Sequence, residues 1–165
     1  MKKSESEILA EVYEMVRGLS IFYLSNLSKI DIDKRIEADG IKYNSAYWIA
    51  AHLVWTEHSL ILNGIAGEDM KIDWLNDYAY GCDPDKIKNK PPIEEVLKTM
   101  DEVHEKALTV IKNQTDEQLD EDNLFGESFG GSKSKRTLII HAIRHEPMHI
   151  GQLSWILKSN GLTFA

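Results

Sequence analysis

Residues 138–157 read LIIHAIRHEPMHIGQLSWIL. Apolar residues recur in this stretch every three or four positions, which is the period of an amphipathic α-helix. His145 and His149 lie one turn apart in its middle, because positions i and i+4 share one face of a helix. Two imidazoles placed in this way can bind one metal ion through ring nitrogens. The stretch therefore predicts a long helix that carries part of a metal site.

Three other stretches show the helical period, so the sequence predicts an all-α fold, a four-helix bundle formed by residues 1–165 as a single domain. Ser4 is a plausible N-cap of the first helix, and Gly64 and Gly161 are plausible C-caps of the second and fourth. The four predicted helices span about residues 5–30, 44–63, 93–111 and 134–160. The predicted core stripe of the first helix is Ile8, Val12, Met15, Leu19, Phe22 and Leu27.

The connections between the predicted helices differ in length. Residues 65–91 form a link much longer than the two to eight residues usual in bundles. Such a link can cross over the bundle and leave the second and third helices parallel. We expect its Trp74, Tyr78 and Tyr80 to cover an apolar end. Residues 123–131, before the fourth helix, are predicted to form a hairpin or a lid.

Composition excludes several classes of function. The 165 residues are 42% hydrophobic and 28% charged, as in an ordinary soluble globular protein. The net charge of −8 and the lack of a basic patch argue against a nucleic-acid partner. No apolar run approaches the ~20 residues of a membrane span, and no apolar secretion segment follows the first residues. Cys82 is the only cysteine, which is compatible with a reducing cytoplasm, where we expect the protein to reside.

The helical wheel selects among the histidines of the fourth helix. His149 falls in the middle of the apolar face and His145 at its edge, whereas His141 lies further out. His141 is therefore expected to be exposed or to support the site from outside. The alternative for the inward pair is a core position bonded to backbone or water, in a bundle that holds no metal. Two inward histidines in register favour the metal site.

The second helix carries an uncharged polar stripe of His52, Thr56, Ser59 and Asn63. A solvated stripe usually contains Lys and Glu, so this one, flanked by tryptophans, resembles the wall of a cleft. A mixed surface is the alternative. Two further histidines have plainer predicted roles. His58 is expected to be structural or exposed, and His104 is either a core histidine or a group near the metal.

Residues 145–149, His-Glu-Pro-Met-His, also match the H-E-x-x-H pattern of zinc peptidases, in which Glu is the general base. Two observations argue against a peptidase. Pro147 removes a backbone donor inside the motif. Residues 150–165 contain no His, Asp, Glu or Cys to supply the downstream third ligand. A third ligand must come from upstream, where His52 is available.

These features together resemble the DinB/YfiT-like family. The likeness rests on His145-x-x-x-His149-x-Gly151-Gln152 and on Trp48-Ile-Ala-Ala-His52-Leu-Val-Trp55, in the right helices of a chain of the right length. The resemblance implies a four-helix bundle, often a homodimer, with a divalent metal held by His52, His145 and His149. Pro147 departs from the family motif and puts the local geometry in question.

The resemblance also directs the expected chemistry. Some family members are thiol-S-transferases or isomerases that use low-molecular-weight thiols. We therefore expect a metal-dependent enzyme, a thiol transferase or a hydrolase, acting on a small-molecule substrate. Zn or Ni is the expected ion, Fe is an alternative, and a low-molecular-weight thiol is an expected second cofactor. Glu146 is a candidate proton acceptor, and Gln152 a candidate partner that orients a ligand histidine.

A second reading of the function stays open. The bundle could bind a metal or a small ligand without turnover. The sequence also gives some support to the expected homodimer. Met148 and Trp155 are apolar residues outside the core stripes, and they point to a contact through the first or fourth helix.

Overall fold

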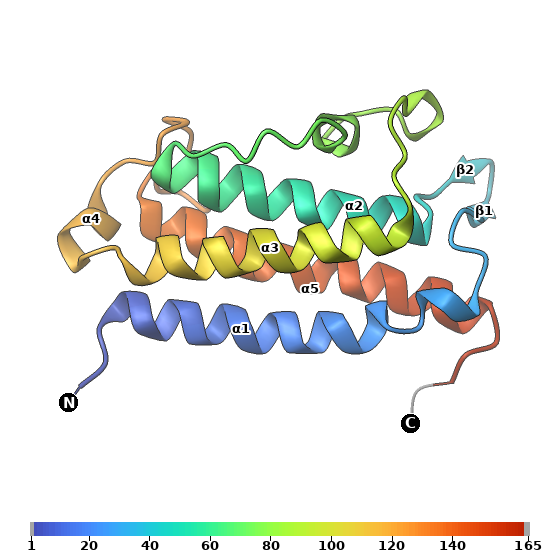
Figure 1. Cartoon of the computed structure of the whole chain (residues 1–165), viewed down its shortest axis with the longest axis horizontal. Helices are drawn as coiled ribbons and strands as arrows, with labels where there is room; N and C mark the ends of the chain where they lie inside the picture. Colours follow the sequence, from blue (N-terminus) through green and yellow to red (C-terminus); the bar gives the residue numbers. More distant parts are fainter. Residues whose placement is uncertain (1, 164–165) are drawn as a thin grey trace.

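The computed structural model describes residues 2–163, and most of them lie in helices that run along one common direction (Figure 1). The all-α prediction is confirmed. Helix α1 packs against α3 and α5, and α2 packs against the same two helices, so the four surround one apolar core. The long helices are α1 (Glu5–Leu24), α2 (Ala46–Glu57), α3 (Ile93–Lys112) and α5 (Lys135–Ser159). A π-helical segment, η2 (His58–Ala66), continues α2.

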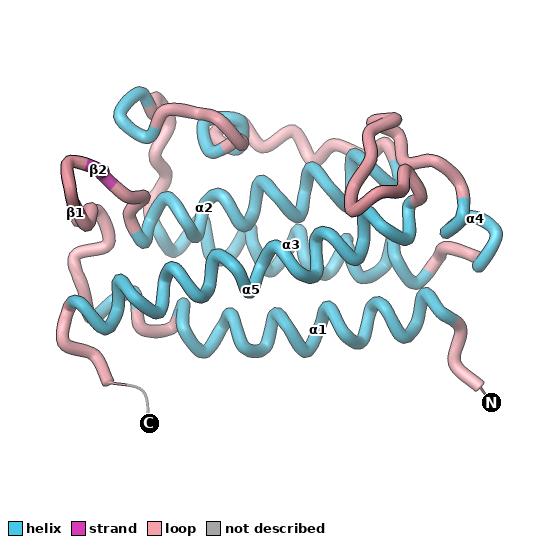
Figure 2. The backbone as a smooth tube through the Cα atoms, turned by 180° about the vertical axis from the view of Figure 1, so that it is seen from behind, coloured by secondary structure: helices cyan, strands magenta, loops and turns pink. Residues whose placement is uncertain are grey.

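Figure 1 shows the chain direction of the four long helices and the path of the link between α2 and α3. Helices α2 and α3 run the same way, and α1 and α5 run the opposite way. The link returns along the outside of the bundle as a mostly irregular segment, visible in Figure 2. It contains two short 3-10 turns, η3 (Leu75–Tyr78) and η4 (Pro84–Lys86). Because the link spans the length of α2, it can place a side chain or carbonyl against that helix.

Short elements complete the connections. A 3-10 turn, η1 (Leu27–Lys29), follows α1. Strands β1 (Glu37–Ala38) and β2 (Ile41–Lys42) form a small antiparallel hairpin before α2. Helix α4 (Asp116–Asp120) follows α3 and precedes α5 in the chain. The predicted hairpin before α5 is present as a loop closed by isolated bridges between residues 122 and 134 and between residues 129 and 132.

Side-chain caps fix where the helices begin. Ser4 accepts a hydrogen bond from the Glu7 backbone amide at 3.2 Å, and the Glu7 carboxylate accepts one from the Ser4 amide at 2.7 Å. This reciprocal capping box satisfies two amides that have no partner inside the helix. Ser45 caps α2 and Ser134 caps α5 in the simpler one-bond form. The prediction of Ser4 as N-cap is therefore confirmed. The prediction of Gly64 as C-cap of the second helix is wrong, because η2 continues to Ala66 and Gly67, with φ 69°, caps it.

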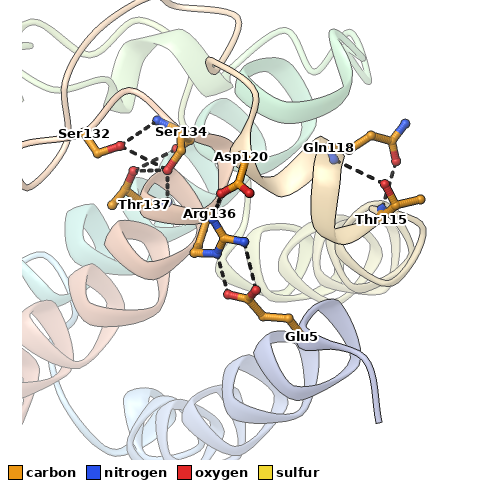
Figure 3. A network of polar contacts seen from close by, with 8 residues as sticks. All are labelled: Glu5, Thr115, Gln118, Asp120, Ser132, Ser134, Arg136 and Thr137. Carbon is orange, nitrogen blue, oxygen red and sulfur yellow. Dashed lines mark hydrogen bonds and ion pairs between the residues drawn. The ribbon is translucent and has the colours of Figure 1, made fainter.

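The N-terminal end of α5 is tied to two other helices (Figure 3). Arg136 donates to the Glu5 carboxylate of α1 at 2.9 Å and also pairs with Asp120 of α4. Thr115 and Gln118 close a capping box on α4 beside this cluster. These contacts fix the position of the N-terminal end of α5. The histidines of α5 follow about two to four turns further along the helix.

The predicted core stripe of α1 is wrong. Most of its members are exposed, Met15 to 76% and Leu19 to 50%, and only Leu27 is buried. The helix also ends at Leu24 and not near residue 30. The inward face consists of Ser6, Ala10, Tyr13, Arg17, Ser20 and Leu24. Because Arg17 is charged, a hydrophobicity pattern scores this face of α1 as polar and predicts the core on the opposite face.

Arg17 is inward because buried acids surround it. Its Nη2 donates to Glu57 of α2 at 2.6 Å and to Glu146 of α5 at 3.0 Å, and its Nε donates to Glu146 at 2.9 Å. His104 of α3 contacts the other oxygen of Glu57 through Nδ1 at 2.7 Å. Burial alone would lower the pKa of Arg17, but the charges of Glu57 and Glu146 raise it above its ordinary value. One ion cluster thus joins all four long helices.

The three aromatic residues singled out in the link between α2 and α3 differ in burial. Trp74 and Tyr78 are buried, but they lie where the link packs along α2 and not over an end of the bundle, and Tyr80 is 88% exposed. Between residues 2 and 163, no helix combines the length and the apolar character needed to cross a bilayer.

Candidate metal centre

Three histidines from two helices meet at one point in the bundle. His52 comes from α2, and His145 and His149 come from α5. One ring nitrogen of each lies within 4.8 Å of the others. His52 and His149 are buried, with 2% and 8% of their surface exposed, and His145 is partly buried. The structure thus brings together the three residues that the sequence singles out as ligands.

The spacing of the ring nitrogens fits one metal ion. His145 Nε2 and His149 Nε2 are 3.3 Å apart. Nitrogens bound at about 2.0–2.1 Å to a tetrahedral zinc ion lie about 3.3–3.4 Å from each other. Two imidazole nitrogens at this distance either share a proton or share a cation. A ring nitrogen of His52 lies within 4.8 Å of this pair, so one cation can be shared by all three rings, whereas one proton can be shared by only two.

Hydrogen bonds fix the protonation pattern of two of the rings. His52 Nδ1 lies 2.7 Å from the carbonyl oxygen of Tyr78, and His149 Nδ1 lies 2.9 Å from Oε1 of Gln152. Both partners are acceptors, so each Nδ1 carries the proton and each Nε2 keeps its lone pair. Partners of this kind orient metal-binding histidines and raise their basicity. The role predicted for Gln152 agrees with this contact.

His145 is held differently. Its Nδ1 is buried and has no hydrogen-bond partner within residues 2–163. Ring contacts surround it instead, with centroids 4.5 Å from His149, 5.5 Å from His52 and 5.8 Å from His141. Packing therefore positions this ring.

Burial keeps the three rings neutral. Desolvation lowers the pKa of His52 to about 4, although its bond to the Tyr78 carbonyl opposes the shift. Desolvation and then the neighbouring histidines lower the pKa of His145 to about 3. Desolvation also lowers the pKa of His149, against the effect of Gln152. Neutral imidazole is the form that binds metals, so the site is ready to bind at neutral pH.

A cleft of about 660 Å³ opens beside the histidines and includes His52 and His145 in its wall. Thr56 and Ser59 of the uncharged stripe line it, as predicted for a cleft wall. Asn63 does not, because its side chain turns to the Glu68 carbonyl. The remaining walls are largely apolar, and two of the aromatic rings come from the loop before α5, at Phe125 and Phe129. That loop, predicted as a hairpin or lid, borders the candidate centre.

His141 also lines this cleft. Arg144 approaches its Nδ1 at 2.9 Å through Nη2 and at 3.2 Å through Nε. A guanidinium can only donate, so Nδ1 accepts and the proton of the neutral ring is on Nε2. Desolvation, followed by the charge of Arg144, lowers the pKa of His141 and favours this neutral form. His141 is thus a hydrogen-bond donor beside the candidate ligands.

Glu146 faces away from this chemistry. Its carboxylate accepts the two hydrogen bonds from Arg17 and is 3% exposed. That pairing favours a structural role for Glu146, and its predicted action as a proton acceptor stays a prediction. Pro147 lies inside α5, and the helix continues on both sides of it from residue 135 to residue 159.

The other histidines have structural partners. His104 belongs to the ion cluster through Glu57, which agrees with a core position. His58 is buried, and its Nε2 accepts a hydrogen bond from the Met70 amide at 3.0 Å.

Sequence reasoning missed one part of the centre and one part of the ion cluster. The Tyr78 carbonyl is a backbone group, so no residue type identifies it in advance. Arg17 carried a usable signal, because a single arginine within an otherwise uncharged inward face of a bundle helix needs a buried acid as partner.

Comparison with protein families agrees with this arrangement. The model of the DinB superfamily matches residues 13–153, which include all three histidines, and the chain belongs to that superfamily. No curated protein matches the chain.

Proposed function

We propose that this DinB superfamily protein binds one divalent metal ion through His52, His145 and His149 and acts on a small molecule held in the adjoining cleft. The observation that supports this most is that His52 and His145 belong both to the cluster and to the cleft wall. A ligand in the cleft would therefore adjoin the ion. A purely structural ion would instead be enclosed by protein groups.

The donor set restricts the ion without selecting one. Three neutral imidazoles suit zinc or nickel, and iron(II) is an alternative. When bound, such an ion would supply Lewis-acid chemistry and would acidify a water or a thiol next to it. The protein's own contribution is the fixed lone pairs of His52 and His149 and a largely apolar cleft beside them.

Two reaction types fit this site. In a hydrolase, water adds across the bond that breaks. In a thiol transferase, the sulfur of a low-molecular-weight thiol forms a bond to an electrophilic carbon, the leaving group departs with its electron pair, and the thiol proton is released. The candidate proton acceptor Glu146 is paired with Arg17, so we assign it no step.

A metal-dependent binding module without turnover is the second candidate. The pairing of Glu146 with Arg17 favours this second candidate. Within residues 2–163, the only carboxylate that lines the cleft is then that of Glu127. The single cysteine, Cys82, supports a cytoplasmic location for either candidate.

The test combines metal content with a reaction screen. Zinc- and nickel-loaded protein would be incubated with activated esters and with aryl halides plus small thiols, beside the His145→Ala variant and a Glu37→Gln control on β1. Turnover that requires both metal and His145 supports the enzyme. Stoichiometric metal with ligand binding but no turnover supports the binding module, and a protein that binds no metal contradicts both.

A further inference from the structure

We infer that the cleft ligand combines three parts: an oxygen or sulfur donor beside the histidines, an apolar body of aromatic size, and a neutral or cationic group beside Glu127. A carboxylate at that last position is disfavoured. This inference rests on the proposed function, because it names the ligand class of the same site.

The apolar body follows from the walls. Six apolar side chains line the cleft, and several of them are unusually exposed for their type, Tyr80 to 88%, Met148 to 54% and Phe125 to 41%. Large exposed apolar groups gathered around one opening mark a binding site rather than ordinary surface. A volume of about 660 Å³ lies in the range of small-molecule sites. The six are Trp55, Leu60, Tyr80, Phe125, Phe129 and Met148.

The loop that carries the aromatic wall is held in place. Asn123 is buried, and its side-chain amide donates to the carbonyls of Glu127 at 2.8 Å and Lys133 at 2.6 Å. Its Oδ1 accepts from the Phe125 amide at 3.0 Å. On the facing helix, a Cβ at Gly64 would come within 2.6 Å of the Phe125 ring. The glycine therefore allows Phe125 to close on η2, and Asn123 fixes the backbone of Glu127 beside the cleft.

The charge of the walls determines which charged group the ligand can carry. Glu127 is the one acidic residue lining the cleft, and no Lys or Arg lines it within the described part of the chain. Arg144 is directed at His141 Nδ1 and is not a lining residue. A carboxylate of the ligand near Glu127 would meet a like charge with no cation to offset it, whereas an ammonium group would gain a partner.

The donor end follows from the histidines. The Nε2–H of His141 offers a hydrogen bond next to His145, so an acceptor atom suits this end of the cleft. The same atom would be the one that adjoins the ion. Thiols that carry several carboxylates match the cleft less well than thiols with an apolar or amino-bearing body.

Three para-substituted benzohydroxamic acids test this ligand class on the zinc-loaded full chain. They share the metal-binding hydroxamate and the ring, and they differ only in an aminomethyl, methyl or carboxyl group at the far end. Calorimetry would give their affinities. We expect the aminomethyl compound to bind about fivefold more tightly than the carboxyl compound, as a charge contact with the exposed Glu127 allows. Glu127→Gln should bring the two affinities close together, and Glu37→Gln, which removes the same charge elsewhere, should leave the difference intact.

The outcomes separate the two proposals. Equal affinities for the aminomethyl and carboxyl compounds on zinc-loaded protein would overturn the ligand class alone. So would a difference that survives Glu127→Gln. A chain that takes up no zinc would overturn the proposed function and, with it, the inference that depends on it.

Discussion

At the scale of single residues, His149 shows how a side chain outside the cluster prepares a candidate ligand. Its Nδ1–H donates to Gln152 at 2.9 Å, and this bond keeps the Nε2 lone pair directed at His145. The acceptor sits three residues along the same helix, so the orientation is built into local sequence. The histidine and its partner should therefore act as a unit in metal binding.

Replacing Gln152 tests that unit. We expect Gln152→Leu to lower the affinity for zinc by about 10–100-fold, because the ring loses the acceptor that fixes its orientation and proton position. Competition with a chromogenic chelator would measure the affinity, with Ser154→Ala on the same helix as the control. An unchanged affinity in Gln152→Leu would show that packing alone orients His149.

The buried rings also predict how stability depends on pH. His52 and His145 titrate at about 4 and about 3 in the folded chain and near 6.5 when unfolded. Between pH 7 and pH 5 the unfolded chain takes up their protons first, so the free energy of unfolding of metal-free protein should fall as pH falls. Carboxylates with ordinary pKa values remain ionised over this window.

Urea titrations of chelator-treated protein at pH 7, 6 and 5 would measure the effect. The His145→Gln variant serves as the comparison, and its slope with pH should be shallower because one titrating ring is gone. Equal slopes in the two proteins would contradict the assignment of His145 as a buried neutral ring.

At the scale of elements, α1 shows what a hydrophobicity pattern can and cannot predict. The helix and its Ser4 cap follow from local signals, and both are present. The buried face does not follow, because Arg17 lies inward through partners on α2 and α5 that are 40 and 129 residues away in sequence. Pairings at that separation leave no trace in a periodicity, so the pattern selected the exposed side.

Removing Arg17 tests the importance of the ion cluster. Arg17→Met would leave the carboxylates of Glu57 and Glu146 buried without their cation, and we expect a loss of about 3–5 kcal/mol in the free energy of unfolding. Lys98→Ala is the control, because its i,i+4 pair with Glu102 is exposed and should contribute little. Chemical denaturation followed by circular dichroism would compare them. A loss for Arg17→Met no larger than for Lys98→Ala would show that the cluster does not stabilise the bundle.

The same contrast holds for the candidate centre. His145 and His149 are predictable as a pair because one helix places them at i and i+4. His52 is predictable as a cleft residue from its uncharged stripe. The Tyr78 carbonyl and the loop ring of Phe125 reach the site through long connections, whose path depends on tertiary packing and not on residue type.

At the scale of the whole molecule, the exposed face of α1 is the clearest candidate for association. Four apolar side chains, spaced three or four residues apart, are each at least 41% exposed. A two-fold contact would cover them with the same face of a second copy, and we propose a homodimer on this basis. Met148 and Trp155, which also suggested a dimer, are exposed but line two separate hollows. The α1 residues are Ile8, Val12, Met15 and Leu19.

A charge on that face tests the dimer. We expect light scattering at micromolar concentration to give twice the 18.8 kDa chain mass for the native protein and the single mass for Met15→Glu. Ile41→Glu, on the exposed β2 strand, should leave the dimer intact. A native protein that is monomeric, or a dimer that Ile41→Glu disrupts as readily as Met15→Glu, would contradict the proposed contact.

Metal content per chain tests the central claim most directly. Protein dialysed against zinc and then against buffer would be analysed for bound metal, together with His149→Ala and with His141→Ala as the control. Circular dichroism would follow the fold of each, which should persist because the apolar core and the ion cluster do not depend on the metal. We predict one zinc per chain in native protein and in His141→Ala, and none in His149→Ala at unchanged helicity. Native protein without stoichiometric metal, or His149→Ala that retains it, would contradict the account.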